Sequence, residues 1–191
     1  MLTSTGRTLS APRGALWNYK NLRSEPPDHA LGRSRGGLST KIHQLVDGHR
    51  LPLVILCGPG QAGDSPMFGP LLDALSVGRA GPGRPRNRPD MLRGDKAYSS
   101  RAIRSTLRRR GIKCVIPEPS DQQKHRRNRG SRGGRPVGPD VEAYRARNVV
   151  ERGYSNVKQW RGLATRYDKL ALTYRAGTVL RATIQWLNHL L

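Results

Sequence analysis

Short apolar segments, separated by loops rich in glycine, proline and arginine, limit most strongly what this chain can fold into. LSTKIHQLV, residues 38–46, alternates polar and apolar side chains, as a strand buried on one face does. LPLVILCG, residues 51–58, is more uniformly apolar and predicts a second strand. Asp47 and Gly48 lie at a turn between the two segments, which therefore predict a β-hairpin.

Further along the chain, helical and strand-like segments alternate. Their boundaries are marked by capping residues, by glycine after a helix and by proline after a strand. The predicted strands end at Asp95 and Pro117, and the predicted helices cover residues 65–77, 99–111, a long stretch after Asp140, and 168–190. This alternation predicts an α/β fold.

The charge of the chain indicates the chemistry of its partner. Its 191 residues include 35 Lys and Arg against 13 Asp and Glu, a formal net charge of +22 at pH 7. Such an excess favours a polyanion, and nucleic acid is the commonest one. No membrane partner is expected, because the chain has neither a long apolar span nor a long basic amphipathic helix. Cys57 and Cys114 lie in apolar runs and are expected to be buried and reduced, in a cytoplasmic, nucleoid-associated protein.

Three segments lack the pattern of a packed element. Residues 1–27 are rich in Ser, Arg, Gly and Pro and predict a disordered N-terminal segment. GRAGPGRPRNRP, residues 78–89, is interpreted as a solvated basic linker, although its Gly-Arg-Pro core weakly resembles hooks that bind the minor groove. Residues 122–139 contain no acid and predict a mobile basic loop close to the polyanion.

One predicted helix carries its polar residues in a single row. At 100° per residue, four side chains of YRARNVVERGYSNVKQW fall within a stripe about 60° wide, opposite an apolar face. These four are Tyr144, Arg147, Glu151 and Lys158. Ordinary surface ion pairs would explain such a row and would contribute little to stability. The alternative is that Glu151 holds a metal ion while the bases around it hold DNA.

The spacing Y-x-x-R-x-x-x-E-x-x-x-x-x-x-K of these four residues resembles the signature of bacterial insertion-sequence DDE transposases of the four/five type. Further blocks appear in the order which that family shows: DHALGRSRGGLSTKIHQLVDG, PGQAGDSP, GDKAYSSRAIR, GIKCVIP, RNVVER and VKQWRGLATRYDKLA. The resemblance covers about residues 28–191, as one catalytic domain. It implies a ribonuclease-H-like mixed sheet flanked by helices. The implied partners are transposon terminal inverted repeats and target DNA, and a homodimer is possible in the intact family.

In that family, three carboxylates hold two divalent metal ions, Mg²⁺ or Mn²⁺. The ions activate the attacking oxygen and stabilise the leaving oxygen during DNA strand cleavage and transfer. The resemblance assigns catalytic and metal-binding roles to Asp95 and Glu151, as the second and third acids. For Asp95 taken alone, a helix N-cap is the simpler interpretation.

The resemblance also implies residues that contact DNA. Tyr144, Arg147 and Lys158 would contact the transposon end, where ionic hydrogen bonds to phosphate are strong. The other candidates for DNA binding are Arg126, Arg127 and Arg161. Three more residues occur in matching blocks without an evident chemical role: His43, Asp64 and Asp168. Of these, Asp168 is expected to cap the last helix.

The family's first acid is where this sequence departs from the pattern. That acid sits on the first strand, upstream of GRSRGG, but residues 1–27 contain no aspartate and their only acid is Glu25. Asp28 and Asp47 are poor substitutes, because the first belongs to a matching loop and the second to the hairpin turn. The prediction is therefore a truncated domain that lacks its first strand and first metal ligand. It would be a defective remnant with DNA affinity, and the alternative is a non-catalytic basic nucleic-acid-binding protein.

Overall fold

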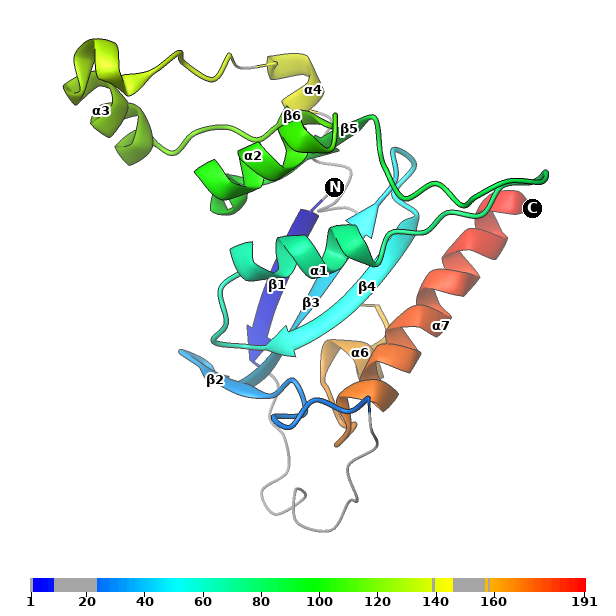
Figure 1. Cartoon of the computed structure of the whole chain (residues 1–191). Helices are drawn as coiled ribbons and strands as arrows, with labels where there is room; N and C mark the ends of the chain where they lie inside the picture. Colours follow the sequence, from blue (N-terminus) through cyan, green and yellow to red (C-terminus); the bar gives the residue numbers. More distant parts are fainter. Residues whose placement is uncertain (1, 9–23, 139, 146–156, 158) are drawn as a thin grey trace.

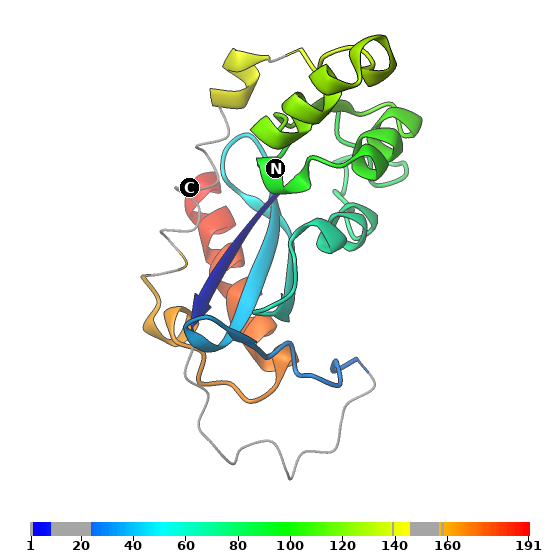
Figure 2. The same ribbon diagram turned by 90° about the vertical axis from the view of Figure 1, so that its left-hand side faces the viewer.

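A four-stranded antiparallel sheet forms the centre of the molecule (Figures 1 and 2). The computed structural model describes residues 24–138, 140–145, 157 and 159–191. For residues 2–8 it describes only the course of the backbone. The long strands are β1 (Leu2–Thr8), β3 (Gly37–Val46) and β4 (Pro52–Pro59), and the short strand β2 (Gly32–Ser34) pairs with the start of β3. β3 lies between β1 and β4.

The predicted hairpin is confirmed as β3 and β4. His43 lies opposite Leu56 in the antiparallel ladder. Asp47 builds the turn, because its Oδ1 atom accepts hydrogen bonds from the backbone N–H groups of His49, at 2.8 Å, and Leu51, at 2.9 Å. A short polar side chain that bonds to the backbone just after it is a common way to stabilise such a turn.

The structure differs from the expectation for the N-terminal segment. Residues 2–8, expected to be disordered, form β1 along one edge of β3, with Leu2 opposite Leu45 and Thr8 opposite Ser39. LTSTGRT has no alternation that marks a strand, but it is rich in threonine, and the long edge of β3 offers a row of hydrogen-bonding partners. Pairing with β3, rather than a local pattern, therefore decides the structure of these residues.

A β–α–β unit follows the hairpin. Strand β5 (Met91–Arg93) runs parallel to β6 (Lys113–Val115), and between them lie η2 (Lys96–Tyr98) and α2 (Arg101–Arg109). The chain leaves α2 at Gly111, whose φ of 65° is a conformation that favours glycine. The predicted order of strand, helix and strand is confirmed here, and so is the α/β character of the fold.

Ser100 begins α2, and its role can be tested. Its Oγ atom accepts a hydrogen bond from the backbone N–H of Ile103 at 3.1 Å. We expect Ser100→Ala to lower the free energy of unfolding by about 1 kcal/mol, measured by urea denaturation. Ser105→Ala, at an exposed position inside the same helix, is the control and should be neutral or slightly stabilising. Equal losses from the two variants would contradict the cap.

The remaining helices lie around these strands. They are η1 (Ser65–Met67), α1 (Phe68–Asp73), α3 (Ser120–Asn128), η3 (Gly130–Gly133), α4 (Val141–Arg145), α6 (Arg161–Ala164) and α7 (Ala171–Leu190). α1 ends before the predicted residue 77, because Val77 pairs with Arg86 in an antiparallel bridge instead. Residues 120–128, mostly predicted as loop, form α3, since Gln, Lys and Arg are good helix formers. None of the helices described combines the length and the apolarity that crossing a bilayer requires.

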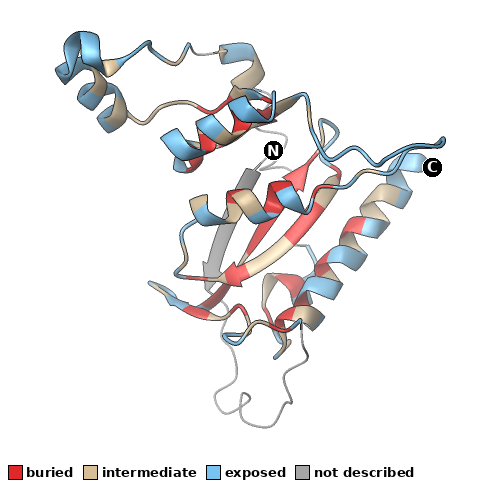
Figure 3. Cartoon of the chain, in the orientation of Figure 1, coloured by how far each residue is buried: buried red, intermediate tan, exposed pale blue. Residues whose placement is uncertain are grey.

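The apolar residues form two cores, one on each face of the central sheet (Figure 3). On one face, Leu45 and Val54 pack with side chains from α1, α2 and β5, among them Leu71, Leu92 and Leu107. On the other face, the partners come from β3, β4, α6 and α7, and they are Ile42, Val46, Ile55, Leu163, Tyr174 and Ala182, together with Val157. The alternation along β3 and β4 therefore serves both faces, which gives a helix–sheet–helix arrangement.

Both cysteines are free thiols, as predicted. Each is partly buried, Cys57 among the residues around α7 and Cys114 among those around α1 and α2. Burial raises the pKa of Cys57 to about 11, so this thiol is protonated and unreactive at neutral pH.

Candidate functional site

Asp95 stands two residues after β5, which ends at Arg93 rather than at the predicted Asp95. The backbone N–H of Gly94 donates to the carbonyl of Val115 at 3.2 Å, so pairing with β6 runs one residue past the strand. A side chain at position 94 would lie 3.2 Å from Cγ1 of Ile116, which explains the glycine. The chain then turns, and Oδ1 of Asp95 accepts from the N–H of Lys96 at 2.6 Å. Asp95 thus lies at the carboxyl end of a parallel strand and caps η2, while its role in metal binding stays a prediction.

A polar network holds the turn that carries Asp95. The Ser99 hydroxyl donates to Oε1 of Gln122 at 2.9 Å, and Nε2 of Gln122 donates to the Ser99 carbonyl at 2.7 Å. Arg104 in α2 donates to Oγ of Ser99 at 3.0 Å and to the carbonyl of Ile116 at 2.7 Å. These bonds join the end of η2, the short helix that Asp95 caps, to α2, to α3 and to the segment after β6.

Tyr144 lies in α4, beside the end of β6. Asp140 begins this helix: one carboxylate oxygen accepts from the N–H of Ala143 at 3.0 Å and the other from Nζ of Lys113 at 2.9 Å. The bond from Lys113 lowers the pKa of Asp140, so the capping carboxylate stays ionised. Tyr144 lines a pocket of about 310 Å³ together with residues of β6, of α3 and of the segment between them, including Glu118 and Arg126.

Arg126 and Arg127 differ in their surroundings although they are adjacent in α3. Arg126 forms a hydrogen-bonded ion pair with Glu118, and both side chains are less than a fifth exposed, at 18% and 16%. Arg127 is exposed. Arg126 therefore holds α3 against the segment after β6, and Arg127 is the better placed of the two to meet a phosphate.

Of the other predicted residues, the structure describes only Arg161. Arg161 is exposed in α6, which lies beside α7 and away from α4 in both views (Figures 1 and 2). Arg147, Glu151 and Lys158 lie outside the residues that the structure describes. Within the part of the chain that it does describe, no three His, Cys, Asp or Glu side chains lie close enough to hold a metal ion.

His43 and Asp64, for which the sequence indicated no chemical role, both contribute to the packing of the fold. His43 is fully buried, and a side chain at Gly58 would lie 3.3 Å from its Nε2 atom. Burial lowers the pKa of His43, so its ring is neutral at pH 7. Asp64 accepts from Nζ of Lys41 at 3.0 Å, and the same ammonium donates to the carbonyl of Ala62 at 2.7 Å. This ion pair anchors the PGQAGDSP loop to β3.

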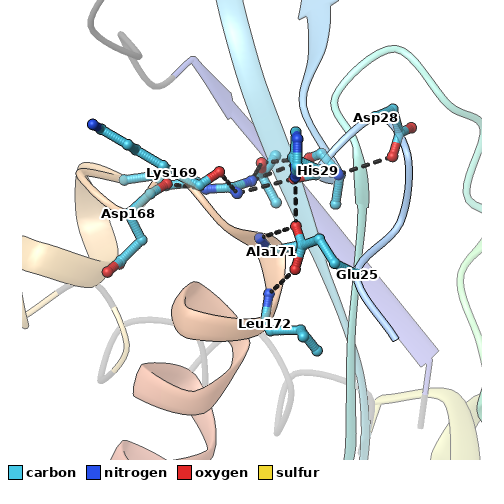
Figure 4. A network of polar contacts seen from close by, with 10 residues as sticks. Glu25, Asp28, His29, Asp168, Lys169, Ala171 and Leu172 are labelled. Carbon is cyan, nitrogen blue, oxygen red and sulfur yellow. Dashed lines mark hydrogen bonds and ion pairs between the residues drawn. The ribbon is translucent and has the colours of Figure 1, made fainter. Parts of the chain in front are cut away.

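Glu25, which sequence reasoning passed over, caps α7 (Figure 4). Its side chain is buried, and its two oxygens accept from the N–H of Ala171 at 2.7 Å and of Leu172 at 2.9 Å. His29 Nδ1 lies 2.8 Å from the same carboxylate. Burial opposes ionisation, but these hydrogen bonds outweigh it and hold the pKa of Glu25 below its ordinary value. The prediction that Asp168 caps this helix is wrong, because a residue distant in sequence occupies the helix end.

Arg166 was also missed, and it is the largest side chain among those fully buried in the described structure. Its guanidinium donates to backbone carbonyls of the 29–30 segment and of residues 168 and 169, and to Oγ1 of Thr40. The group lies 5.2 Å from the centre of the Tyr174 ring. Most of these partners come from residues 29–40, far from Arg166 in the sequence, so only the tertiary structure identifies them.

Comparison with known proteins agrees with the resemblance seen in the sequence. Residues 18–182 match the family model of the transposase DDE domain. A putative transposase for insertion sequence element IS402 of Burkholderia cepacia is 30% identical over 171 residues, which cover 90% of this chain and 70% of that protein. No solved structure matches the chain. Because the family model spans most of the sequence and the transposase of Burkholderia cepacia aligns along nearly all of it, this chain belongs to the transposase DDE domain family.

Proposed function

We propose that this chain is a DNA-binding member of the transposase family whose catalytic site lacks its first carboxylate. The observation that carries the proposal is the sequence of β1. Residues 2–8, LTSTGRT, pair with β3 where the first strand of a ribonuclease-H-like sheet would pair with the second, and none of them is acidic. DDE chemistry requires an acid on that strand.

The metal chemistry of the family fits this chain only in part. Two divalent ions would activate the attacking oxygen and stabilise the leaving oxygen of the DNA strand. Asp95, at the end of β5, offers one carboxylate of the required kind, and we assign Glu151 as the second. Two acids supply too few oxygens to hold a pair of ions, so we assign no cleavage step to this chain.

DNA binding depends on the basic residues rather than on the metal. Tyr144 lies in α4, and the family resemblance groups it with Arg147 and Lys158, so we propose that these three meet the transposon end. The exposed side chains of Arg127 and Arg161 are proposed to contact phosphate as well. Arg126 is better assigned to the ion pair with Glu118.

Binding without cleavage is the expected result with purified protein and a labelled transposon-end duplex in Mg²⁺ or Mn²⁺. Raising the salt about fourfold should weaken binding on the order of a hundredfold if about four phosphates are contacted. Asp95→Ala should keep the DNA affinity or raise it slightly, because it removes a negative charge and none of the proposed DNA contacts. Gel mobility and product sizes on a denaturing gel measure both quantities.

Two outcomes would overturn parts of this proposal. Metal-dependent cleavage that Asp95→Ala abolishes would show a working site, completed by an acid other than one in β1. Failure to bind DNA would remove the functional assignment altogether. Glu151→Gln provides a further control, because a non-catalytic binder should keep its DNA affinity or bind slightly more tightly when a negative charge is removed.

A further inference from the structure

The loop between α1 and β5 projects from the molecule as a closed basic hairpin. The backbones of Val77 and Arg86 exchange two hydrogen bonds, of 2.9 and 2.8 Å, and so close the loop at its base. We call residues 78–85 the basic finger; all of them are exposed. The segment extends beyond the central sheet, at the end of the molecule away from α3 in Figure 1.

The charge at the tip of the basic finger is not neutralised within the described structure. The sequence has no acid from Gly78 to Pro89. At the base, Arg86 donates to both oxygens of Asp90, at 3.1 and 3.0 Å. Arg79 and Arg84, in contrast, form no salt bridge with any residue that the structure describes. These two guanidinium groups are therefore available to a polyanion.

The basic finger is narrow. Apart from Arg79 and Arg84, its residues are glycine, alanine and proline. Gly83, with a φ of 134°, makes a turn that L side chains rarely adopt, and a Cβ atom there would lie 3.8 Å from Cδ of Arg79. Pro82 and Pro85 fix their own φ angles, which reduces the entropy lost when such a loop is ordered by a partner.

These properties match the minor groove of DNA better than the major groove. The minor groove is only about 6 Å wide, too narrow for a helix, and proteins reach into it with narrow segments that carry arginine. In A-tracts it is narrower still, and its negative potential attracts inserted arginine side chains. A loop that only contacted phosphates with a broad basic surface would need neither the small residues of the basic finger nor its closed base.

We propose that the basic finger binds the minor groove of AT-rich duplex DNA, with Arg79 and Arg84 as the inserted side chains. The proposal rests on the proposed function only in requiring that the chain binds DNA. It is independent of Asp95 and of any metal ion. The basic finger would give the chain a second contact with DNA, away from α4, and a preference for AT-rich sequences.

The test compares two duplexes of equal length, one with a central A-tract and one rich in G and C, by fluorescence anisotropy with the full chain. Wild-type protein is expected to prefer the A-tract by about tenfold, and netropsin, which occupies the minor groove, should remove the preference. Arg79→Ala/Arg84→Ala should bind both duplexes equally. Arg101→Ala/Arg108→Ala loses the same charge from the exposed face of α2 and should keep the preference.

A second variant separates shape from charge. A Cβ atom at Gly78 or Gly81 would meet nothing within 4 Å, so Gly78→Val/Gly81→Val should fold and keep every arginine. Its wider finger should lose the A-tract preference while binding to the GC-rich duplex stays within about twofold. Circular dichroism of each variant verifies the fold.

The outcomes distinguish this inference from the proposed function. If wild-type protein binds neither duplex, both fail. If it binds both equally, or if the valine variant keeps the A-tract preference, the finger contacts phosphates only and this inference alone is overturned. Loss of the preference in the valine variant but not in the α2 control supports insertion into the minor groove.

Discussion

Replacing Arg166 with alanine is expected to lower the free energy of unfolding by about 3–5 kcal/mol. The side chain is 1% exposed and donates to the carbonyl oxygens of His29 and Asp168, both at 2.9 Å, and to the Thr40 hydroxyl. Its removal leaves these acceptors buried without a donor, and it also leaves a cavity beside Tyr174. Urea denaturation, followed by tryptophan fluorescence, measures the loss.

Two variants test whether geometry rather than charge explains the effect of Arg166. Arg166→Lys keeps the positive charge but cannot reproduce the planar fork of donors, so it should recover less than half of the loss. Arg101→Ala removes an exposed arginine and should change stability by less than about 0.5 kcal/mol. A lysine variant as stable as the wild type would mean that the fork geometry is unimportant.

The second large effect is expected at Glu25. Glu25→Ala leaves the N–H groups of Ala171 and Leu172 without an acceptor at the start of α7, and it also removes the partner of His29. We expect a loss of about 2–4 kcal/mol at pH 7, because the acceptor is a buried charged group bonded by several donors. Glu142→Gln, at an exposed position in α4, is the control and should be nearly neutral.

The contribution of Glu25 should also depend on pH. Because the folded pKa lies below the ordinary value, the folded state favours the ionised carboxylate. The stabilisation is therefore fully present above the ordinary pKa and is lost as the pH falls through the lower folded pKa. Denaturation of wild type and of Glu25→Gln over a series of acidic pH values should show their difference shrinking in that window. A difference that stays constant would contradict an ionised cap.

The local pattern was sufficient where each element carries its own signal. β3 and β4 were predicted by alternation, and the turn between them by Asp47 and Gly48. The β5–α2–β6 unit was predicted by two apolar runs and by the glycine that ends the helix between them, and the structure adds the Ser100 cap. Asp95 was predicted as the last residue of this strand, and it lies two residues beyond the end of β5.

Contacts between residues distant in sequence could not be predicted from the local pattern. β1 has no alternation of its own and forms on the edge of β3. Arg126 looks in the sequence like one more basic residue for DNA, but Glu118 holds it in an ion pair. Asp168 stands where an N-cap would be expected, yet Glu25, far away along the chain, takes that role.

The sequence by itself therefore determined the α/β class, the β-hairpin, the excess of positive charge and the resemblance to DDE transposases, because each depends on composition, on neighbouring residues or on a preserved order of motifs. Only the tertiary structure decided that residues 2–8 complete the sheet without an acid, that Glu25 and Arg166 join the 24–30 segment to α7, and that a closed basic finger leaves the body of the molecule. The physical reason is that strand pairing and the hydrogen bonds of buried polar groups depend on which segments meet in space. The spacing of residues along the chain does not show which segments meet.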